Sequence, residues 1–218
     1  MDIDPYKTTN IDSTGGDPFG ASAYKKLSRP GCGLILCLVA IAWIVEIADQ
    51  VFGFIGLPLD ALGIRPRKMS GLPGIFLSPW LHGNWGHLFN NTFAFLGLGF
   101  LMVIAEGKRF LRTSFLLILI SGFGTWLIGR GGSVHIGASG LIYGYFGYFL
   151  LRAWTERKPI WVVGGILVSI FYGGMVWGIL PTDERVSWEA HFCGFIGGLW
   201  LGRNHGLLSK SRESLPTL

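Results

Sequence analysis

Six apolar segments, separated by polar or glycine-rich stretches, divide the chain from residue 33 onward. Most of them approach the ~20 residues that a helix needs to cross a lipid bilayer. The pattern therefore predicts an all-α membrane protein, built as a bundle of six transmembrane helices. The expected spans cover residues 33–55, 88–105, 110–128, 139–154, 160–180 and 188–203.

The polar ends of the chain predict two tails around this core. Residues 1–30 are rich in Asp and Lys, and such a long acidic head does not fit a cleavable signal peptide, so we expect a flexible cytoplasmic tail. Residues 31–205 are the expected membrane-embedded core, and residues 206–218 a cytoplasmic C-terminal tail. The stretch 56–87 mixes Gly and Pro with apolar side chains, which indicates an irregular loop lying partly in the outer membrane interface.

Composition and charge support the membrane interpretation. Half of the 218 residues are hydrophobic and 14% are charged, whereas a soluble domain carries about 25% charged residues. The net charge of +5 comes from basic residues scattered between apolar runs, which argues against a nucleic-acid partner. With the N-terminus inside, 13 Lys and Arg lie in inside segments and 5 in outside ones. This excess satisfies the positive-inside rule and predicts that both termini are cytoplasmic.

Polar side chains recur near one end of three of the expected spans. Histidine, asparagine and acidic residues are costly in hydrocarbon, so within a membrane they indicate function by default. Alternating topology makes the second, fourth and sixth segments run from outside to inside. Their polar residues therefore lie at similar depth on the same side: His87 and Asn91, Ser139, and His191.

A serine and a histidine are the minimal set of side chains for nucleophilic acyl chemistry. His191 can take the hydroxyl proton of Ser139 if the two are within hydrogen-bonding reach. No acidic orienting residue is evident, because Glu189 is two residues from His191 and projects to another face of its helix. We therefore favour a dyad over a triad. Counting residues along the fourth segment places Ser139 roughly 10 Å below the outer surface, a depth that suits hydrolysis inside the bilayer.

Small residues at helical spacing explain how the two catalytic candidates could meet. Stripes of small residues let the backbones of two helices approach closely. The expected faces consist of Gly194, Gly198 and Gly202 on the sixth segment, and of Gly140, Gly144 and Gly147 on the fourth. Ordinary helix packing without catalysis is the alternative explanation of the glycines, but it does not explain a serine and a histidine at the equivalent ends of both faces.

Donors for a developing oxyanion are the next requirement of an acyl-transfer site. His87 and Asn91 are spaced i, i+4 and point from one helix face, so with the backbone N–H of Ser139 they could form an oxyanion hole. The alternative is a polar helix start that bonds the neighbouring loop. His82 would line the cavity or brace the first loop. No metal is expected, because the spacing of His82 and His87 lacks the HExxH pattern of zinc proteases.

Two acidic residues of the first segment are unusual for a membrane helix. Glu46 and Asp49 would either face a hydrated cavity or bond the long loop that follows. We favour a structural role, because acids within a membrane usually find interior partners.

Together these residues resemble the rhomboid family of intramembrane serine proteases, over residues 72 to about 203. The motifs that carry the resemblance are His82-x4-His87-x3-Asn91, Gly137-Ala138-Ser139-Gly140 with Tyr143, and Ala190-His191-x2-Gly194-x3-Gly198.

The resemblance implies a nucleophile at Ser139 and a general base at His191. It also implies an oxyanion hole from His87, Asn91 and the Ser139 amide, and a Tyr143 ring packed on His191. Family members cleave transmembrane segments of other membrane proteins and need no cofactor. The implied setting is the lipid bilayer of a bacterial plasma membrane, with the oligomeric state left open.

Two features depart from the family pattern. The Trp-Arg pair found in the first loop of many members is absent. Glu106-Gly107 matches the usual glutamate-glycine pattern only in part, because its spacing differs. Both concern the anchoring of the loop and the control of lateral access; glycine- and proline-rich outer loops, particularly around Pro181, are candidate gates.

Two alternative functions remain. One is a non-catalytic rhomboid-like protein that binds transmembrane helices. The other is a small transporter or channel, which would need polar groups at both depths of the membrane.

Overall fold

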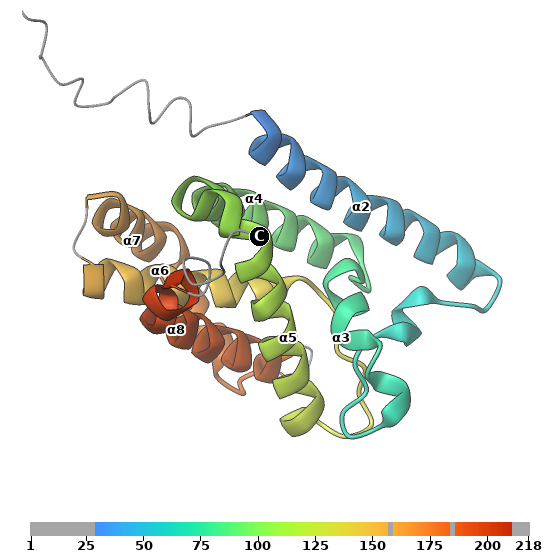
Figure 1. The fold of residues 1–218 in the computed structure, drawn as a ribbon. Helices are drawn as coiled ribbons and strands as arrows, with labels where there is room; N and C mark the ends of the chain where they lie inside the picture. The colour runs from blue at the N-terminus through green and yellow to red at the C-terminus, as the bar shows by residue number, and fades with distance from the viewer. Residues whose placement is uncertain (1–28, 157–158, 184–185, 211–218) are drawn as a thin grey trace, which may run out of the picture.

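The computed structural model describes residues 29–156, 159–183 and 186–210, and the chain is helical through most of them. Within these ranges there is no strand, and the only sheet-like pairing is an isolated antiparallel bridge between Ile64 and His135. Six long helices dominate the architecture (Figure 1). They are α2 (Arg29–Phe54), α4 (Trp85–Glu106), α5 (Phe110–Ile128), α6 (Ser139–Glu156), α7 (Pro159–Tyr172) and α8 (Trp188–Lys210).

Each of the six apolar segments corresponds to one of these helices, and the fourth begins at Ser139 as expected. The fifth differs, because α7 ends at Tyr172 and the chain continues as a 3₁₀ helix, η5 (Gly173–Ile179). Two consecutive glycines open η5, and glycine is a poor α-helix former. The expected N-terminal tail lies almost entirely outside the described residues, as does the end of the C-terminal one.

Three stretches of the described chain are long and apolar enough to cross a membrane. They are Gly33–Phe54, Trp85–Ile128 and Trp161–Ile179, and the second contains both α4 and α5. The outer faces of α2 and α7 expose large apolar side chains, including Ile44 and Phe171. Together with the six apolar segments, this pattern is that of a helical membrane protein.

Helix α6 lies at the centre of the bundle, packed against α4, α5, α7 and α8. Its residues from Gly140 to Phe149 are all buried, and Tyr145 and Phe146 belong to a core that also includes Leu98 of α4 and Leu117 of α5. A helix that is buried on every side is the inner element of a bundle. The side chains at the start of α6 therefore project into protein.

The first loop, residues 56–87, is irregular, as its Gly and Pro content predicts. It contains four short helical turns: η1 (Leu59–Leu62), η2 (Met69–Gly71), α3 (Gly74–Leu77) and η3 (Ser78–Trp80). Of these turns, α3 packs against α5, where Ile75 lies so close to Gly122 that a Cβ there would be 2.7 Å from the Ile75 side chain, whereas η1 and η3 contact α2. The loop is thus part of the packed structure of the bundle.

Helices α6 and α8 approach each other more closely than side chains would allow. A Cβ added at Gly194 would overlap the carbonyl oxygen of Gly140, and one at Gly198 would overlap that of Gly144. These are the two glycine faces expected from the sequence. Backbone contact of this kind aligns the N-terminal ends of α6 and α8, where Ser139 and His191 lie.

Candidate active site

Ser139 is the first residue of α6 and is half-buried. The chain reaches it through irregular backbone in which Gly137 has φ +110°, a left-handed value that favours glycine. The Gly137 N–H donates to the carbonyl of Ser78 at 2.8 Å, and His135 pairs with Ile64 of the first loop. The nucleophile candidate is thus placed by a helix start on one side and by the first loop on the other.

His191 lies one turn into α8 and is buried. Its Nδ1 is 2.8 Å from the carbonyl oxygen of Gly178. Because a carbonyl only accepts, Nδ1 carries the proton, and Nε2 of the neutral ring keeps its lone pair. The imidazole also stacks on the ring of Tyr143, with centroids 4.0 Å apart and an interplanar angle of 11°. The hydrogen bond therefore sets the tautomer that a general base requires, and the stacking fixes the orientation of the ring.

Gly178 is a residue that sequence reasoning missed. A Cβ at this position would overlap the Tyr143 hydroxyl, so only glycine lets η5 come close enough for its carbonyl to reach His191. The sequence showed merely a glycine-rich end to an apolar segment. A backbone carbonyl acts here where a triad would use an acidic side chain.

Ser139 and His191 are neighbours across the α6–α8 interface. Gly140 follows the serine and Ala190 precedes the histidine, and a Cβ on Gly140 would lie 3.3 Å from the Ala190 carbonyl. Tyr143, one helical turn after Ser139, carries the ring on which His191 stacks. The structure thus brings together the serine, the histidine and the tyrosine named from the sequence.

His87 and Asn91 meet the backbone just before Ser139. A Cβ on Gly137 would lie 2.6 Å from Nε2 of His87 and 3.3 Å from Nδ2 of Asn91, so both side chains face this glycine. Nδ2 of Asn91 is buried without a hydrogen-bond partner in the described structure. A buried unpaired donor is costly, and here it lies beside Gly137, two residues before Ser139.

His87 also bonds to the first loop, as the alternative interpretation held. Its Nδ1 donates to the carbonyl of His82 at 2.6 Å. With Nδ1 protonated, Nε2 of the neutral ring is an acceptor, and it becomes a donor only in the imidazolium form. Asn91 is therefore the side chain that can donate to an oxyanion in either protonation state of His87.

His82 braces the first loop and also lines a cavity. Its Nδ1 donates to the Trp80 carbonyl at 3.3 Å, and its ring meets His87 edge-on with centroids 5.2 Å apart. Burial, and then the neighbouring His87, lower the pKa of His82 to about 4. The ring therefore stays neutral in the physiological pH range.

The cavity has a volume of about 350 Å³ and lies between α2, α4, α5 and α6. Its lining is almost wholly apolar, with Ala42, Phe95 and Phe115 among its residues, and it reaches Asn91 and Ala138 beside the candidate site. The polar groups thus lie at the edge of an apolar space within the bundle.

The two acidic residues of α2 have different partners. Asp49 accepts the backbone N–H of Asp60 at 3.0 Å and so ties α2 to the first loop, whereas Glu46 accepts from Gln50 at 3.0 Å. The Asp60 carboxylate in turn accepts from the backbone of His82 and Gly83. Of the two roles considered from the sequence, Asp49 therefore has the loop-binding one.

No group of three or more His, Cys, Asp or Glu side chains among the described residues is arranged to hold a metal ion.

Comparison with known proteins finds similarity over most of the chain. A family model of the Rhomboid domain matches residues 70–205. The uncharacterized protein Rv1337 of Mycobacterium tuberculosis is 42% identical over 173 residues, which are 76% of this chain and 71% of that protein. The uncharacterized protein ML1171 of Mycobacterium leprae is 39% identical over 173 residues, 76% of this chain and 67% of that protein. RHOMBOID-like protein 5 of Arabidopsis thaliana is 34% identical over 133 residues, 56% of this chain and 40% of that protein.

Proposed function

The chain belongs to the rhomboid family, and from that premise we propose that it is an intramembrane serine endopeptidase. Its substrates would be membrane proteins, cleaved within or beside a transmembrane segment. The observation that carries the proposal is the state of His191, whose Nδ1–H is donated to Gly178 and whose ring is stacked on Tyr143. Nε2 is left as a base next to the start of α6.

In the proposed reaction, the Ser139 oxygen attacks the carbonyl carbon of the scissile peptide bond while Nε2 of His191 takes the hydroxyl proton. The substrate oxygen becomes an oxyanion, which accepts hydrogen bonds from Asn91 and from the backbone N–H of Ser139. The imidazolium then donates its proton to the leaving nitrogen, and an acyl-enzyme remains. Water, deprotonated by the same Nε2, hydrolyses the ester and restores the serine.

Helix geometry supports the oxyanion part of this proposal. The first N–H groups of a helix have no partner within the helix, and the helix dipole favours negative charge there. Ser139 begins α6, so its own N–H is one of these unpaired groups. The positive end of α6 and the Asn91 amide would therefore approach the same oxygen.

We also propose that all six long helices span the bilayer and that both termini are cytoplasmic, in a bacterial plasma membrane. The support is the excess of Lys and Arg in the inside segments and the clustering of the polar site at one end of the bundle. In this orientation the site opens toward the exterior. Water can then reach the acyl-enzyme from that side.

The central test is Ser139→Ala in the purified full-length chain. We expect cleavage of a reporter transmembrane substrate to fall about 10⁴-fold or more, as for loss of a nucleophile in other serine enzymes. Ser139 is half-buried, so the thermal unfolding midpoint should stay close to that of the unmodified protein. Ser169→Ala on α7, where the hydroxyl bonds only the Gly165 carbonyl at 2.8 Å, is the matched serine control and should cleave normally.

Labelling by a fluorophosphonate gives a second readout. Such a probe should modify the unaltered protein at Ser139 and leave Ser139→Ala unlabelled. Undiminished cleavage by Ser139→Ala would refute the mechanism. Binding of transmembrane helices without cleavage or labelling would instead favour the non-catalytic rhomboid-like function.

A further inference from the structure

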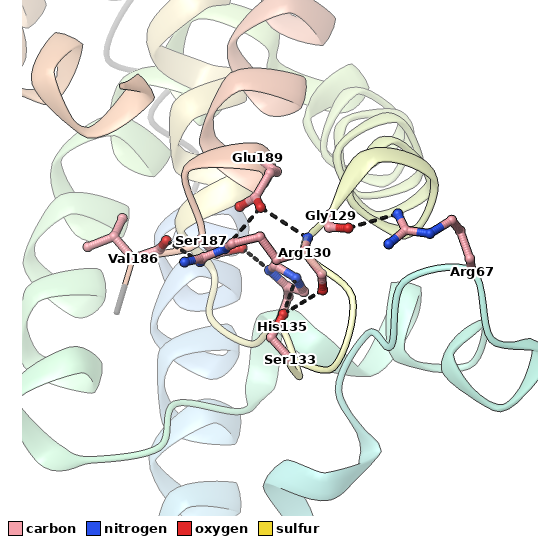
Figure 2. Close-up of polar contacts among 8 residues, drawn as sticks. All are labelled: Arg67, Gly129, Arg130, Ser133, His135, Val186, Ser187 and Glu189. Atoms are coloured by element: carbon pink, nitrogen blue, oxygen red, sulfur yellow. Dashed lines mark hydrogen bonds and ion pairs between the residues drawn. The ribbon is translucent and has the colours of Figure 1, made fainter. Parts of the chain in front are cut away.

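A second set of polar side chains, apart from the proposed catalytic groups, joins the loop before Ser139 to the start of α8 (Figure 2). Arg130 lies just beyond the end of α5, and both its backbone N–H and its Nε donate to Oε1 of Glu189 at 3.1 Å. Its Nη2 donates to the carbonyl of Val186 at 2.7 Å. Glu189 is 0% exposed, so this ion pair is buried on its acidic side.

Ser133, His135 and Ser187 make a second connection between the same two segments. The Ser133 hydroxyl donates to the Arg130 carbonyl at 2.7 Å and accepts from Nε2–H of His135 at 2.9 Å. Nδ1 of His135 is then an acceptor, and the Ser187 hydroxyl donates to it at 2.5 Å. Burial lowers the pKa of His135, which keeps the ring in the neutral form that this chain of bonds uses.

The first loop holds the end of α5, from which Arg130 follows. Nη1 of Arg67 donates to the carbonyls of Leu127 and Gly129, at 3.0 and 2.8 Å, and so binds the last carbonyls of α5. Arg67 has φ +58°, an uncommon backbone conformation for a residue other than glycine. Figure 2 shows its guanidinium directed at Gly129, the residue before Arg130.

The positions of these residues along the chain give the network its significance. His135 is four residues before Ser139, while Ser187 and Glu189 are four and two residues before His191. The bonds therefore join the two segments that lead directly into the nucleophile and the base. The glycine interface sets how closely α6 and α8 pack, and the polar network sets where their outer ends lie relative to each other.

We propose that Arg130 and Glu189, supported by Ser133, His135 and Ser187, are positioning residues that hold Ser139 and His191 in reacting geometry. We call these five residues the outer clamp. The inference rests on the proposed function, since it concerns the alignment of the two groups that carry it out. Their hydrogen bonds described above join the backbone segments that lead to Ser139 and His191, and we infer that they act through these segments.

Charge burial explains why the clamp uses an ion pair. Oε2 of Glu189 is buried with no hydrogen-bond partner in the described structure, so the arginine contacts on Oε1 are what compensates this carboxylate. Removing one partner of a buried pair leaves an uncompensated charge and forces the surroundings to rearrange. A displacement of about 1 Å between reacting groups can cost about 10²-fold in rate.

The test compares variants of Glu189 and Arg130 in the purified full-length chain, with kcat and KM measured on the folded fraction. Glu189→Ala should lower kcat by about 10²-fold and slow fluorophosphonate labelling of Ser139 in parallel, with KM little changed. Glu189→Gln keeps an oxygen for the Arg130 backbone N–H but loses the charge. Its kcat should therefore fall less than that of Glu189→Ala. Arg130→Lys should retain more activity than Arg130→Ala, because it keeps the charge.

Tyr148→Phe is the matched control for loss of a buried polar contact. It removes the bond from the Tyr148 hydroxyl to Oε1 of Glu106 at 2.7 Å, between α6 and α4. Tyr148 lies nine residues after Ser139, about 14 Å along α6 at ~1.5 Å per residue. This variant should lower the unfolding midpoint while its folded fraction keeps normal kcat.

Each outcome decides the proposal. It is overturned if Glu189→Ala keeps normal kcat, or loses activity only in proportion to the folded fraction. If Glu189→Ala does not fold, Glu189→Gln and Arg130→Lys decide, and normal kcat in both would overturn it. Failure of the proposed function looks different, because the unaltered protein itself would then neither cleave a reporter nor be labelled at Ser139.

Discussion

The helix pairs α6–α8 and α2–α4 are held together in opposite ways. Between α6 and α8, glycines bring backbone against backbone, as at Gly140 and Gly194. Between α2 and α4 the contact is made by large side chains, with Trp43 edge-on to Phe89 at 4.8 Å and its Nε1 donating to Thr92 at 3.1 Å. The cavity of about 350 Å³ lies on this second side.

The tight helix pair aligns the proposed nucleophile and base, whereas the looser pair leaves space beside the proposed oxyanion hole. The pair that carries Ser139 and His191 leaves no room for a Cβ at its closest points, so those two groups keep their alignment. His87 and Asn91 come from α4, whose packing against α2 leaves free volume. In a membrane, where lipid competes with any loose apolar contact, close backbone packing is one effective way to hold two helices together.

Among the substitutions that test this difference, Gly194→Ala should have the largest effect on stability and activity. The added methyl group would overlap the Gly140 carbonyl, which is backbone and cannot rotate away. We expect a loss of about 1–3 kcal/mol or more in unfolding free energy, together with loss of cleavage, because the separated helices would no longer align Ser139 with His191. Thermal unfolding and reporter cleavage measure the two effects.

Gly33→Ala is the matched control on α2, since nothing lies within 4 Å of a Cβ there. Alanine is the better helix former, by up to about 1 kcal/mol. This variant should therefore be as stable as the unmodified protein or more so, with normal activity. Equal effects of the two substitutions would show that the glycine contact between α6 and α8 has no special importance.

Ala42→Leu should have a smaller effect. Ala42 lines the cavity from α2, so a larger apolar side chain has space to occupy. Size changes that a site can absorb usually cost less than about 1.5 kcal/mol, and we expect the unfolding midpoint to stay near that of the unmodified protein. A loss as large as that of Gly194→Ala would show that α2 and α4 pack as tightly as α6 and α8.

The smallest effect concerns the ionisation of Asp60, which anchors the first loop beside α2. Burial, with the charges of Asp49 and Glu46, raises the pKa of Asp60 from 3.8 to about 6. Between these two values the folded state binds more protons than the unfolded state. The contribution of Asp60 to stability is therefore present at low pH and is lost as pH rises through about 6.

Asp60→Asn isolates this contribution. His82 and His135 titrate in the opposite sense, because their pKa values are lowered, so the pH dependence of the unmodified protein alone mixes these contributions. The difference in unfolding midpoint between the unmodified protein and Asp60→Asn should favour the unmodified protein more at pH 5 than at pH 7.5. A difference that does not vary with pH would contradict the raised pKa of Asp60.

Much of the fold was predictable because apolar runs and glycine spacing act locally. The six segments correspond to the six long helices, and the irregular first loop was expected from its Gly and Pro content. The end of α7 at Tyr172 was missed, because the residues that follow are apolar enough to continue a helix and only their glycines favour the change to 3₁₀ geometry.

The site was predictable only where side-chain identity carries information. Ser139 and His191 stood out as polar residues at matching depth in the expected spans. The partner of His191 did not, because Gly178 acts through its backbone carbonyl and every residue has one. Glu189 was judged by its place on its own helix, which hid its pairing with Arg130, 59 residues away in the chain.

The amino-acid sequence by itself determined a helical membrane chain of the rhomboid family, with a serine and a histidine at the starts of two glycine-lined helices. Hydropathy, helix period and motif spacing are local properties, so they can be read along one dimension. Only the tertiary structure decided which atom holds the imidazole and which segments the outer clamp joins. Those contacts join groups far apart in sequence, and no local pattern marks the Gly178 carbonyl or the Arg130–Glu189 pair as partners.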